Sequence, residues 1–301
     1  MDIAQKLRDI TKDDAVKSYN ELKESSIQSP DFSRIGLKAL DYYFLHHRIK
    51  TKTRRHISFY EAIKDNAMIK QLDILIARYK KKQVGDYDDV GLLKARYQVF
   101  QLYYGTINQF RPMIAKWIYS LFKPSVGILD FSSGWGGRAL AAMSMGIPYI
   151  GIDANKKLEA SYRNMIHAYE PNAPIVMIFK PSEEVDFSRF KYDLIFTSPP
   201  YFMIEEYEKM PKYQSKQNFL NTFFTPVIME VWKHLLPGGN MALNMPEEMY
   251  LAVKDMLPKV KRELLLPLSN RHPSNAVKRR TLGKRDKERH ELIYVWHKQK
   301  I

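Results

Sequence analysis

The chain has 301 residues, with 48 Lys or Arg against 33 Asp or Glu, so its formal net charge at pH 7 is +15. This surplus favours a polyanionic partner such as a nucleic acid, because each neutralised phosphate releases counterions. There is no cysteine, which excludes disulfides, Cys-ligated zinc, iron–sulfur clusters and thiolate nucleophiles. We expect no metal site, and the oligomeric state stays open.

Hydrophobic residues make up 45% of the chain, enough to build a core. No run of about 18 apolar residues is present, so we expect no membrane contact. The first residues carry charges and lack the apolar stretch of a signal peptide. The expected location is intracellular: the cytoplasm, the nucleus or, for a viral protein, a host cell.

The first third of the chain has helical periodicity. Apolar residues recur at helical spacing through Ile35–Leu45 and Ile69–Tyr79, with breaks at Ser29–Pro30 and Gly85–Asp86. We therefore expect a helical domain over residues 1–100, which would contact nucleic acid or another subunit.

From about Phe110 short apolar runs alternate with helical segments, which indicates a mostly parallel sheet with helices on both faces. The expected strands are Val126–Phe131, Tyr149–Asp153, Pro174–Phe179, Tyr192–Thr197, Asn240–Met245, Arg262–Pro267 and Leu292–His297. The expected helices are Gly137–Met145, Lys157–Tyr169, Phe219–Leu236 and Glu247–Met256. We assign residues 101–301 to this α/β domain.

A glycine-rich turn follows the first expected strand. Gly134, Gly136 and Ala139 fit the dinucleotide pattern, and Asp153 ends the second strand, where an acid accepts hydrogen bonds from ribose hydroxyls. Asp130 precedes the glycines, and a carboxylate there would repel a pyrophosphate. It would suit the ammonium and sulfonium of S-adenosylmethionine, so we favour this cofactor over a dinucleotide. In the simplest alternative, the glycines serve only a tight turn.

The fourth expected strand runs directly into Ser198-Pro199-Pro200-Tyr201. Two prolines fix two φ angles and remove two donors, which leaves a rigid turn with carbonyls free to accept. The Ser198 hydroxyl and the Pro199 carbonyl suit the two hydrogens of a base amino group, and Tyr201 suits stacking on the ring. The alternative is a bare turn that ends a strand.

An exocyclic amine is a poor nucleophile because its lone pair is delocalised into the ring. Hydrogen-bond acceptors for both amine hydrogens would localise that lone pair toward the methyl group of S-adenosylmethionine. Such a turn would act by positioning and electrostatics. Cytosine-C5 methylation needs a cysteine nucleophile, which this chain does not have.

These motifs resemble those of the DNA amino-methyltransferases, which act on adenine N6 or cytosine N4. The likeness lies in Asp130–Gly137, in Thr197–Tyr201 and, loosely, in Phe110–Pro112, and it covers roughly residues 110 to 297. It implies a Rossmann-like class I methyltransferase sheet of seven strands, S-adenosyl-L-methionine as cofactor and DNA as substrate, with cytosine N4 slightly favoured.

The resemblance assigns catalysis to Ser198, Pro199, Pro200 and Tyr201. For the donor we expect contacts from Phe110, Pro112, Asp130, Phe131, Ser132, Gly134, Gly136, Asp153, Ala154 and Ser182. Ser182 is placed there because a serine or acid after the third strand often contacts the donor's adenine in this fold. The adjacent Glu183 and Glu184 are equally consistent with a solvated turn.

A basic insertion, residues 269–291, separates the last two expected strands and would project over the catalytic edge. Its cations would hold phosphates while a base is extruded, or would simply be solvated. The candidate nucleic-acid contacts are Arg271, Lys278, Arg279, Arg280, Lys284 and Arg285. Three alternatives remain: an RNA base methyltransferase, a non-catalytic nucleic-acid-binding subunit and, last, a nicotinamide oxidoreductase.

Overall fold

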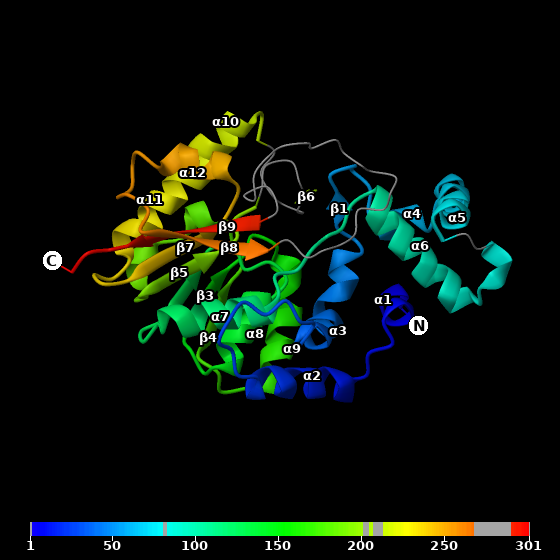
Figure 1. Cartoon of the computed structure of the whole chain (residues 1–301), viewed down its shortest axis with the longest axis horizontal. Helices are drawn as coiled ribbons and strands as arrows, with labels where there is room; N and C mark the ends of the chain where they lie inside the picture. The colour runs from blue at the N-terminus through cyan, green and yellow to red at the C-terminus, as the bar shows by residue number, and fades with distance from the viewer. Residues whose placement is uncertain (1, 81–82, 201–204, 207–212, 268–289, 301) are drawn as a thin grey trace.

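The computed structural model of the chain describes residues 2–80, 83–200, 205–206, 213–267 and 290–300 (Figure 1). The basic insertion and Tyr201 therefore lie outside the described residues, apart from the last two positions of the insertion. None of the described helices is long and apolar enough to cross a membrane.

A seven-stranded sheet forms the centre of the α/β unit, as the sequence predicts. Its strands are β2 (Ile128–Asp130), β3 (Tyr149–Ile152), β4 (Ile175–Ile178), β5 (Leu194–Thr197), β7 (Asn240–Asn244), β8 (Arg262–Pro267) and β9 (His290–His297). They lie in the order β4-β3-β2-β5-β7-β9-β8, and β9 runs antiparallel to the other six strands, which are parallel to one another. Numbered from the first strand of the sheet, this is the order 3-2-1-4-5-7-6 of the predicted Rossmann-like class I methyltransferase sheet.

Chain order reverses between β2 and β5, the kind of switch point at which α/β sheets bind ligands outside their carboxyl ends. The strands are short and apolar on both sides because helices cover both faces, which is why β2, β3 and β5 are completely buried. Ligand-binding residues are therefore expected in the turns that follow these strands.

Two groups of helices cover the two faces of the sheet (Figure 1). One face carries α7 (Pro112–Phe122), α8 (Gly137–Ser144) and α9 (Glu159–Tyr169). The other carries α10 (Lys216–Phe219), a π-helical turn at Leu220–Phe224, α11 (Thr225–His234) and α12 (Glu247–Val253). Helix α7, which the sequence analysis did not anticipate, begins with proline at its first position, where a missing N–H costs no hydrogen bond.

The helical region expected over residues 1–100 divides into two parts. Helices α2 (Lys12–Glu24) and α3 (Leu37–Arg48) pack on the α/β unit, with Tyr19 stacked on Tyr169 at 4.7 Å and Phe44 edge-on to Tyr162 at 5.0 Å. Periodicity reveals an apolar helical face but not its partner, so the sequence could not place these two helices in the α/β core.

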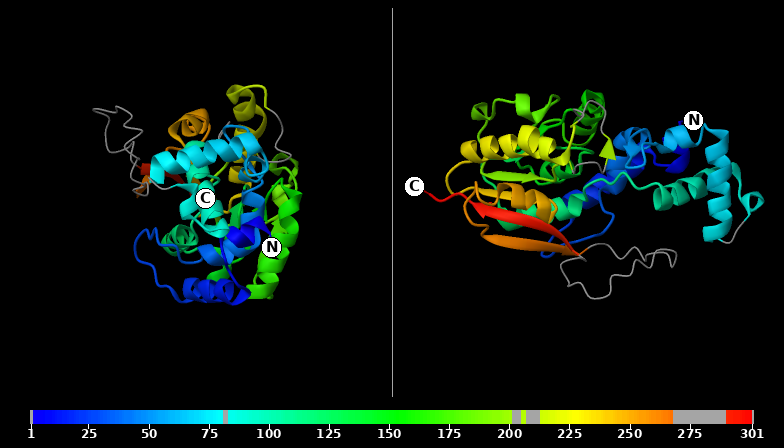
Figure 2. Two further views of the ribbon diagram at one scale, coloured as in Figure 1. Left: turned by 90° about the vertical axis from the view of Figure 1, so that its right-hand side faces the viewer. Right: turned by 90° about the horizontal axis from the view of Figure 1, so that it is seen from above.

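The second part, here called the helical module, comprises α1 (Ile3–Leu7), α4 (Phe59–Ala62), α5 (Asn66–Lys80) and α6 (Asp89–Tyr103). It has its own apolar cluster and projects from the α/β unit (Figure 2). A two-residue antiparallel pairing joins β1 (Lys52–Thr53) to β6 (Glu205–Glu206), so the module is tied to the segment that follows the Ser-Pro-Pro turn.

Candidate active site

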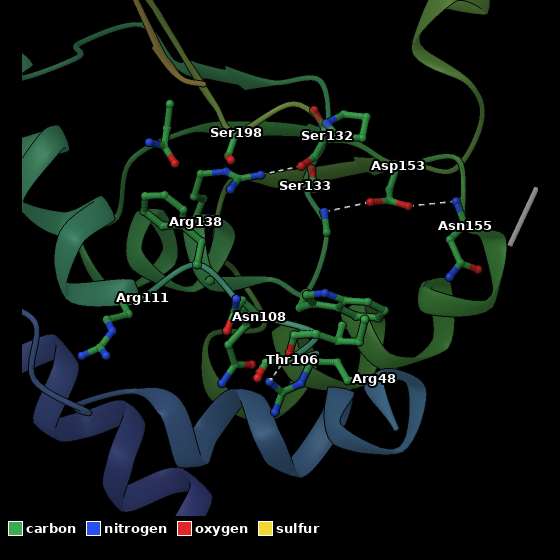
Figure 3. A pocket seen from close by; sticks show the side chains of 18 of the residues that line it. Arg48, Thr106, Asn108, Arg111, Ser132, Ser133, Arg138, Asp153, Asn155 and Ser198 are labelled. Atoms are coloured by element: carbon green, nitrogen blue, oxygen red, sulfur yellow. Dashed lines mark hydrogen bonds between the residues drawn. The ribbon is translucent and has the colours of Figure 1, made fainter. Parts of the chain in front are cut away.

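A cavity of about 970 Å³ lies at the carboxyl ends of the parallel strands (Figure 3). Turns after four strands line it: Phe131–Gly134 after β2, Asp153–Asn155 after β3, Pro181–Glu183 after β4 and Ser198–Pro200 after β5. The helical module and the segment 106–111 line the opposite side. The two motifs of the sequence analysis therefore share one cavity.

Most of the predicted site residues in the described part of the chain line this cavity. Those that do are Phe110, Phe131, Ser132, Gly134, Asp153, Ala154, Ser182, Ser198, Pro199 and Pro200. Pro112, Asp130 and Gly136 lie outside the lining. Tyr201, Arg271, Lys278, Arg279, Arg280, Lys284 and Arg285 lie outside the described residues.

The glycine turn needs its glycines for two reasons. Gly134 and Gly136 have φ values of 57° and 79°, in the left-handed region that other residues rarely adopt. At Gly137 the reason is space, because a Cβ there would lie 2.0 Å from the carbonyl oxygen of Phe110. The backbone of the turn thus lies close to the backbone of the Phe110 segment, and this close approach shapes one side of the cavity.

Asp153 has a carboxylate held by two backbone N–H groups, from Gly134 to Oδ2 and from Asn155 to Oδ1, each at 2.8 Å. Burial raises the pKa of Asp153 to about 6, although these two hydrogen bonds act to lower it. Each carboxylate oxygen accepts one bond and retains a second lone pair. The side chain is therefore oriented and still able to accept ribose hydroxyls.

Asp130, expected beside the donor's positive groups, is instead fully buried and paired with Arg138. The guanidinium of Arg138 donates from Nε to Oδ2 at 2.6 Å and from Nη2 to Oδ1 at 3.2 Å. The carboxylate also accepts from the Tyr149 and Thr197 hydroxyls. Because its charge is already matched, Asp130 acts on the cavity through the groups that it holds.

Thr197 connects the two predicted motifs. Its hydroxyl donates to Asp130 Oδ1 at 2.7 Å and lies 3.1 Å from the Ser132 hydroxyl, while Thr197 itself directly precedes Ser198. On the neighbouring turn, the Ser182 hydroxyl donates to the carbonyl of Phe131. Polar contacts thus fix the glycine turn to the turns that follow β4 and β5.

Arg138 and Asn244, which lines the cavity from the end of β7, were not predicted as site residues, and Thr197 was predicted only as the first residue of the Thr197–Tyr201 likeness. A signal for Arg138 was present, since it is the one charged residue in an apolar, wholly buried helix that follows the glycine turn. Such a side chain needs a buried acid, and Asp130 is the nearest acid before it in the sequence. Among the described residues no group of three or more His, Asp or Glu could hold a metal ion.

No family model and no curated protein matches the sequence. Solved structures do match: TrmN from Thermus thermophilus is 19% identical, with a TM-score of 0.44, over 62% of this chain and 48% of that chain. A tRNA m1G37 methyltransferase from M. jannaschii is 13% identical, TM-score 0.39, over 62% and 49%. An rRNA methylase from Streptococcus thermophilus is 11% identical, TM-score 0.40, over 64% and 100%.

This chain spans about half the length of the first two of these proteins. The substrates that their names state are those of these three proteins. The strand order and the position of the cavity together identify the architecture of this chain as a Rossmann-like class I methyltransferase fold.

Proposed function

We propose that this protein transfers a methyl group from S-adenosylmethionine to an exocyclic amino group of a nucleic-acid base. One observation carries the proposal: the turn Ser132–Gly134, Asp153 and Ser198–Pro200 line the same cavity at the switch point of the sheet. A nucleoside-binding acid and a rigid set of amine acceptors are the two parts that such a transfer needs.

The residues present fit the donor. The volume of about 970 Å³ lies within the range of small-molecule sites and leaves room for a base beside the cofactor. Asp153 would accept the ribose hydroxyls, and Ser132–Gly134 would face the methionine part across from Phe110. Asp153 and Glu183 are acids of the lining near these turns, so the cavity offers negative charge to a cationic donor.

The Ser-Pro-Pro turn would hold the base. The Ser198 hydroxyl and the Pro199 carbonyl would accept the two amine hydrogens, and Tyr201 would stack on the ring. The donor supplies an electrophilic methyl on a sulfonium. The turn would direct the amine lone pair at that carbon, and the donor would leave as a neutral thioether. Ser198 is too weak a base to act first, so the methylated, cationic amine would lose its proton to water afterwards.

DNA is the polymer that the sequence resemblance implies, with cytosine N4 slightly ahead of adenine N6, and RNA is the alternative. The net charge of +15 suits both, because both present phosphates. A non-catalytic nucleic-acid-binding subunit is the candidate from another class. An enzyme is favoured because one cavity holds both the residues that would bind the methyl donor and those that would bind the amino group of the base.

The deciding experiment is transfer of labelled methyl from S-adenosylmethionine to double-stranded DNA, single-stranded DNA and RNA, with nucleoside analysis of each product. N4-methylcytosine or N6-methyladenine in DNA supports the DNA reading and identifies the base. Label in RNA alone would support the proposed methyl transfer and would make RNA, not DNA, the substrate. No label in any polymer, with the donor bound, favours the binding-subunit alternative.

A further inference from the structure

The side of the cavity that faces the strand ends is strongly basic. Five cations line it, and we call them the basic wall: Arg8, Arg34, Arg48, Lys94 and Arg111. They come from the residue after α1, from the connection before α3, from α3, from α6 and from the residue before α7. The only carboxylate in the lining from these same elements is Asp41 of α3.

Asp41 matches only part of this charge. Its carboxylate pairs with Arg48 and lies 3.4 Å from Arg8, so one acid serves two arginines. Arg34 and Lys94 are exposed, and within the described part of the chain neither side chain has a hydrogen bond or an acidic partner. Two uncompensated cations at the rim of a cavity are expected to attract an anion.

Uncharged groups between the cations suit a polynucleotide. The lining includes the half-buried rings of Phe32, Tyr97 and Phe110, and four amide side chains, those of Gln98, Gln101, Asn108 and Gln109. In the view of Figure 3, Thr106, Asn108 and Arg111 lie across the cavity from Ser198. Cations interleaved with aromatic faces are typical of surfaces that hold single-stranded nucleic acid, where phosphates contact the cations and bases stack.

We propose that the basic wall binds the phosphodiester backbone of the single-stranded segment that carries the target base, so that this side of the cavity serves as the polynucleotide-binding surface. The identity of this strand as the methyl acceptor rests on the proposed function. The binding itself does not, and it can be measured without any methyl transfer. Both DNA and RNA have this backbone, and the experiment includes each of them.

The test uses the full chain carrying Arg34→Gln together with Lys94→Gln. Both positions are exposed, so the fold is expected to survive, which circular dichroism and thermal unfolding would check. The matched control is Lys70→Gln with Arg163→Gln. It removes the same charge and the same residue types from exposed positions on α5 and α9, outside the cavity lining.

The probe is a fluorescein-labelled single strand of about 12 nucleotides, as DNA and as RNA, followed by anisotropy between about 50 and 200 mM salt. Losing two phosphate contacts should weaken binding roughly 20-fold near 0.1 M salt and lower the slope of log affinity against log salt by about 1.4. The control variant should keep the wild-type slope, and calorimetry should show unchanged S-adenosylmethionine binding in both.

Three results would overturn the proposal: unchanged oligonucleotide affinity in the wall variant, an equal loss in the control, or wild-type KM for the polymer in the wall variant. The proposed function fails separately. If the wall variant loses binding while wild-type protein methylates no nucleic acid, the basic wall stands and the methyltransferase assignment is lost.

Discussion

The Arg138 guanidinium lies against the carboxylate of Asp130, with Nε 2.6 Å from Oδ2, and both side chains are almost completely buried. Arg138 comes from the first turn of α8 and also donates to the carbonyl of Ser132, on the glycine turn. One ion pair therefore fixes the end of β2, the start of α8 and the turn between them. We infer that this ion pair holds in place the part of the cavity that would bind the methyl donor.

Arg138→Met is expected to lower the free energy of unfolding by about 3–5 kcal/mol, because it leaves the Asp130 carboxylate buried without its cation. Urea unfolding followed by circular dichroism measures the change. The double variant Arg138→Met, Asp130→Asn should recover part of the loss, since the uncompensated charge is then absent. Arg163→Met, at an exposed position, should change stability by less than about 0.5 kcal/mol. A similar effect at both arginines would contradict the assigned role.

Thr197→Val should reduce turnover by about 10- to 100-fold, because the hydroxyl that ties the residue before Ser198 to Asp130 is lost. Donor affinity should change far less, since Thr197 is outside the cavity lining. Thr197→Ser keeps the hydroxyl and should restore most of the turnover. The measurement is kcat with saturating polymer beside a calorimetric Kd for the donor. A loss confined to donor affinity would refute the positioning role.

Ser198→Ala removes one proposed acceptor of the amine hydrogens, so kcat should fall by about 100-fold while the donor Kd stays near the wild-type value. Single-turnover methyl transfer separates this chemical step from binding. A double variant, Pro199→Ala with Tyr201→Ala, should also be impaired. Unchanged turnover in that double variant would remove the catalytic assignment of the whole turn.

Ionisation of Asp153 predicts a pH dependence. Burial raises its pKa from the usual 3.8 to about 6, so the folded state binds a proton that the unfolded state releases between these values. Its contribution to the free energy of unfolding therefore decreases as pH rises from about 4 to 6. Donor binding should behave in the opposite way and weaken below about pH 6, where the ribose acceptor becomes protonated.

Calorimetric titration of the donor from about pH 5 to 8 checks this. Asp153→Asn should bind the donor weakly at every pH, with the step near pH 6 absent. Its unfolding free energy should not show the decrease that Asp153 produces in the wild type. If Asp153→Asn kept the wild-type pH step, a different group would be responsible for it.

The sheet could be predicted because its signal is local. Buried parallel strands such as Leu194–Thr197 appear as short apolar runs that end in polar turns, and the structure confirms all seven. Packing partners are not local. The sequence shows an apolar face on α3 but not that Phe44 lies against Tyr162, and it shows Arg138 in an apolar segment but not that its guanidinium contacts both carboxylate oxygens of Asp130. Charge predicted a polyanionic partner, whereas the cavity wall formed by α1, α3 and α6 needed the tertiary structure.

Gly137→Ala tests whether the close approach of two backbone segments shapes the cavity. The added Cβ would lie 2.0 Å from the carbonyl oxygen of Phe110, and a backbone atom cannot move aside as cheaply as a flexible side chain. We expect a loss of about 1–3 kcal/mol in unfolding free energy, as for other overpacked sites, together with weaker donor binding as the Phe110 segment shifts. Gly85→Ala is the matched control, because a Cβ there meets nothing within 4 Å. Equal unfolding midpoints and equal donor affinities for the two variants would show that the segment yields without cost and that its contact with the glycine turn does not shape the site.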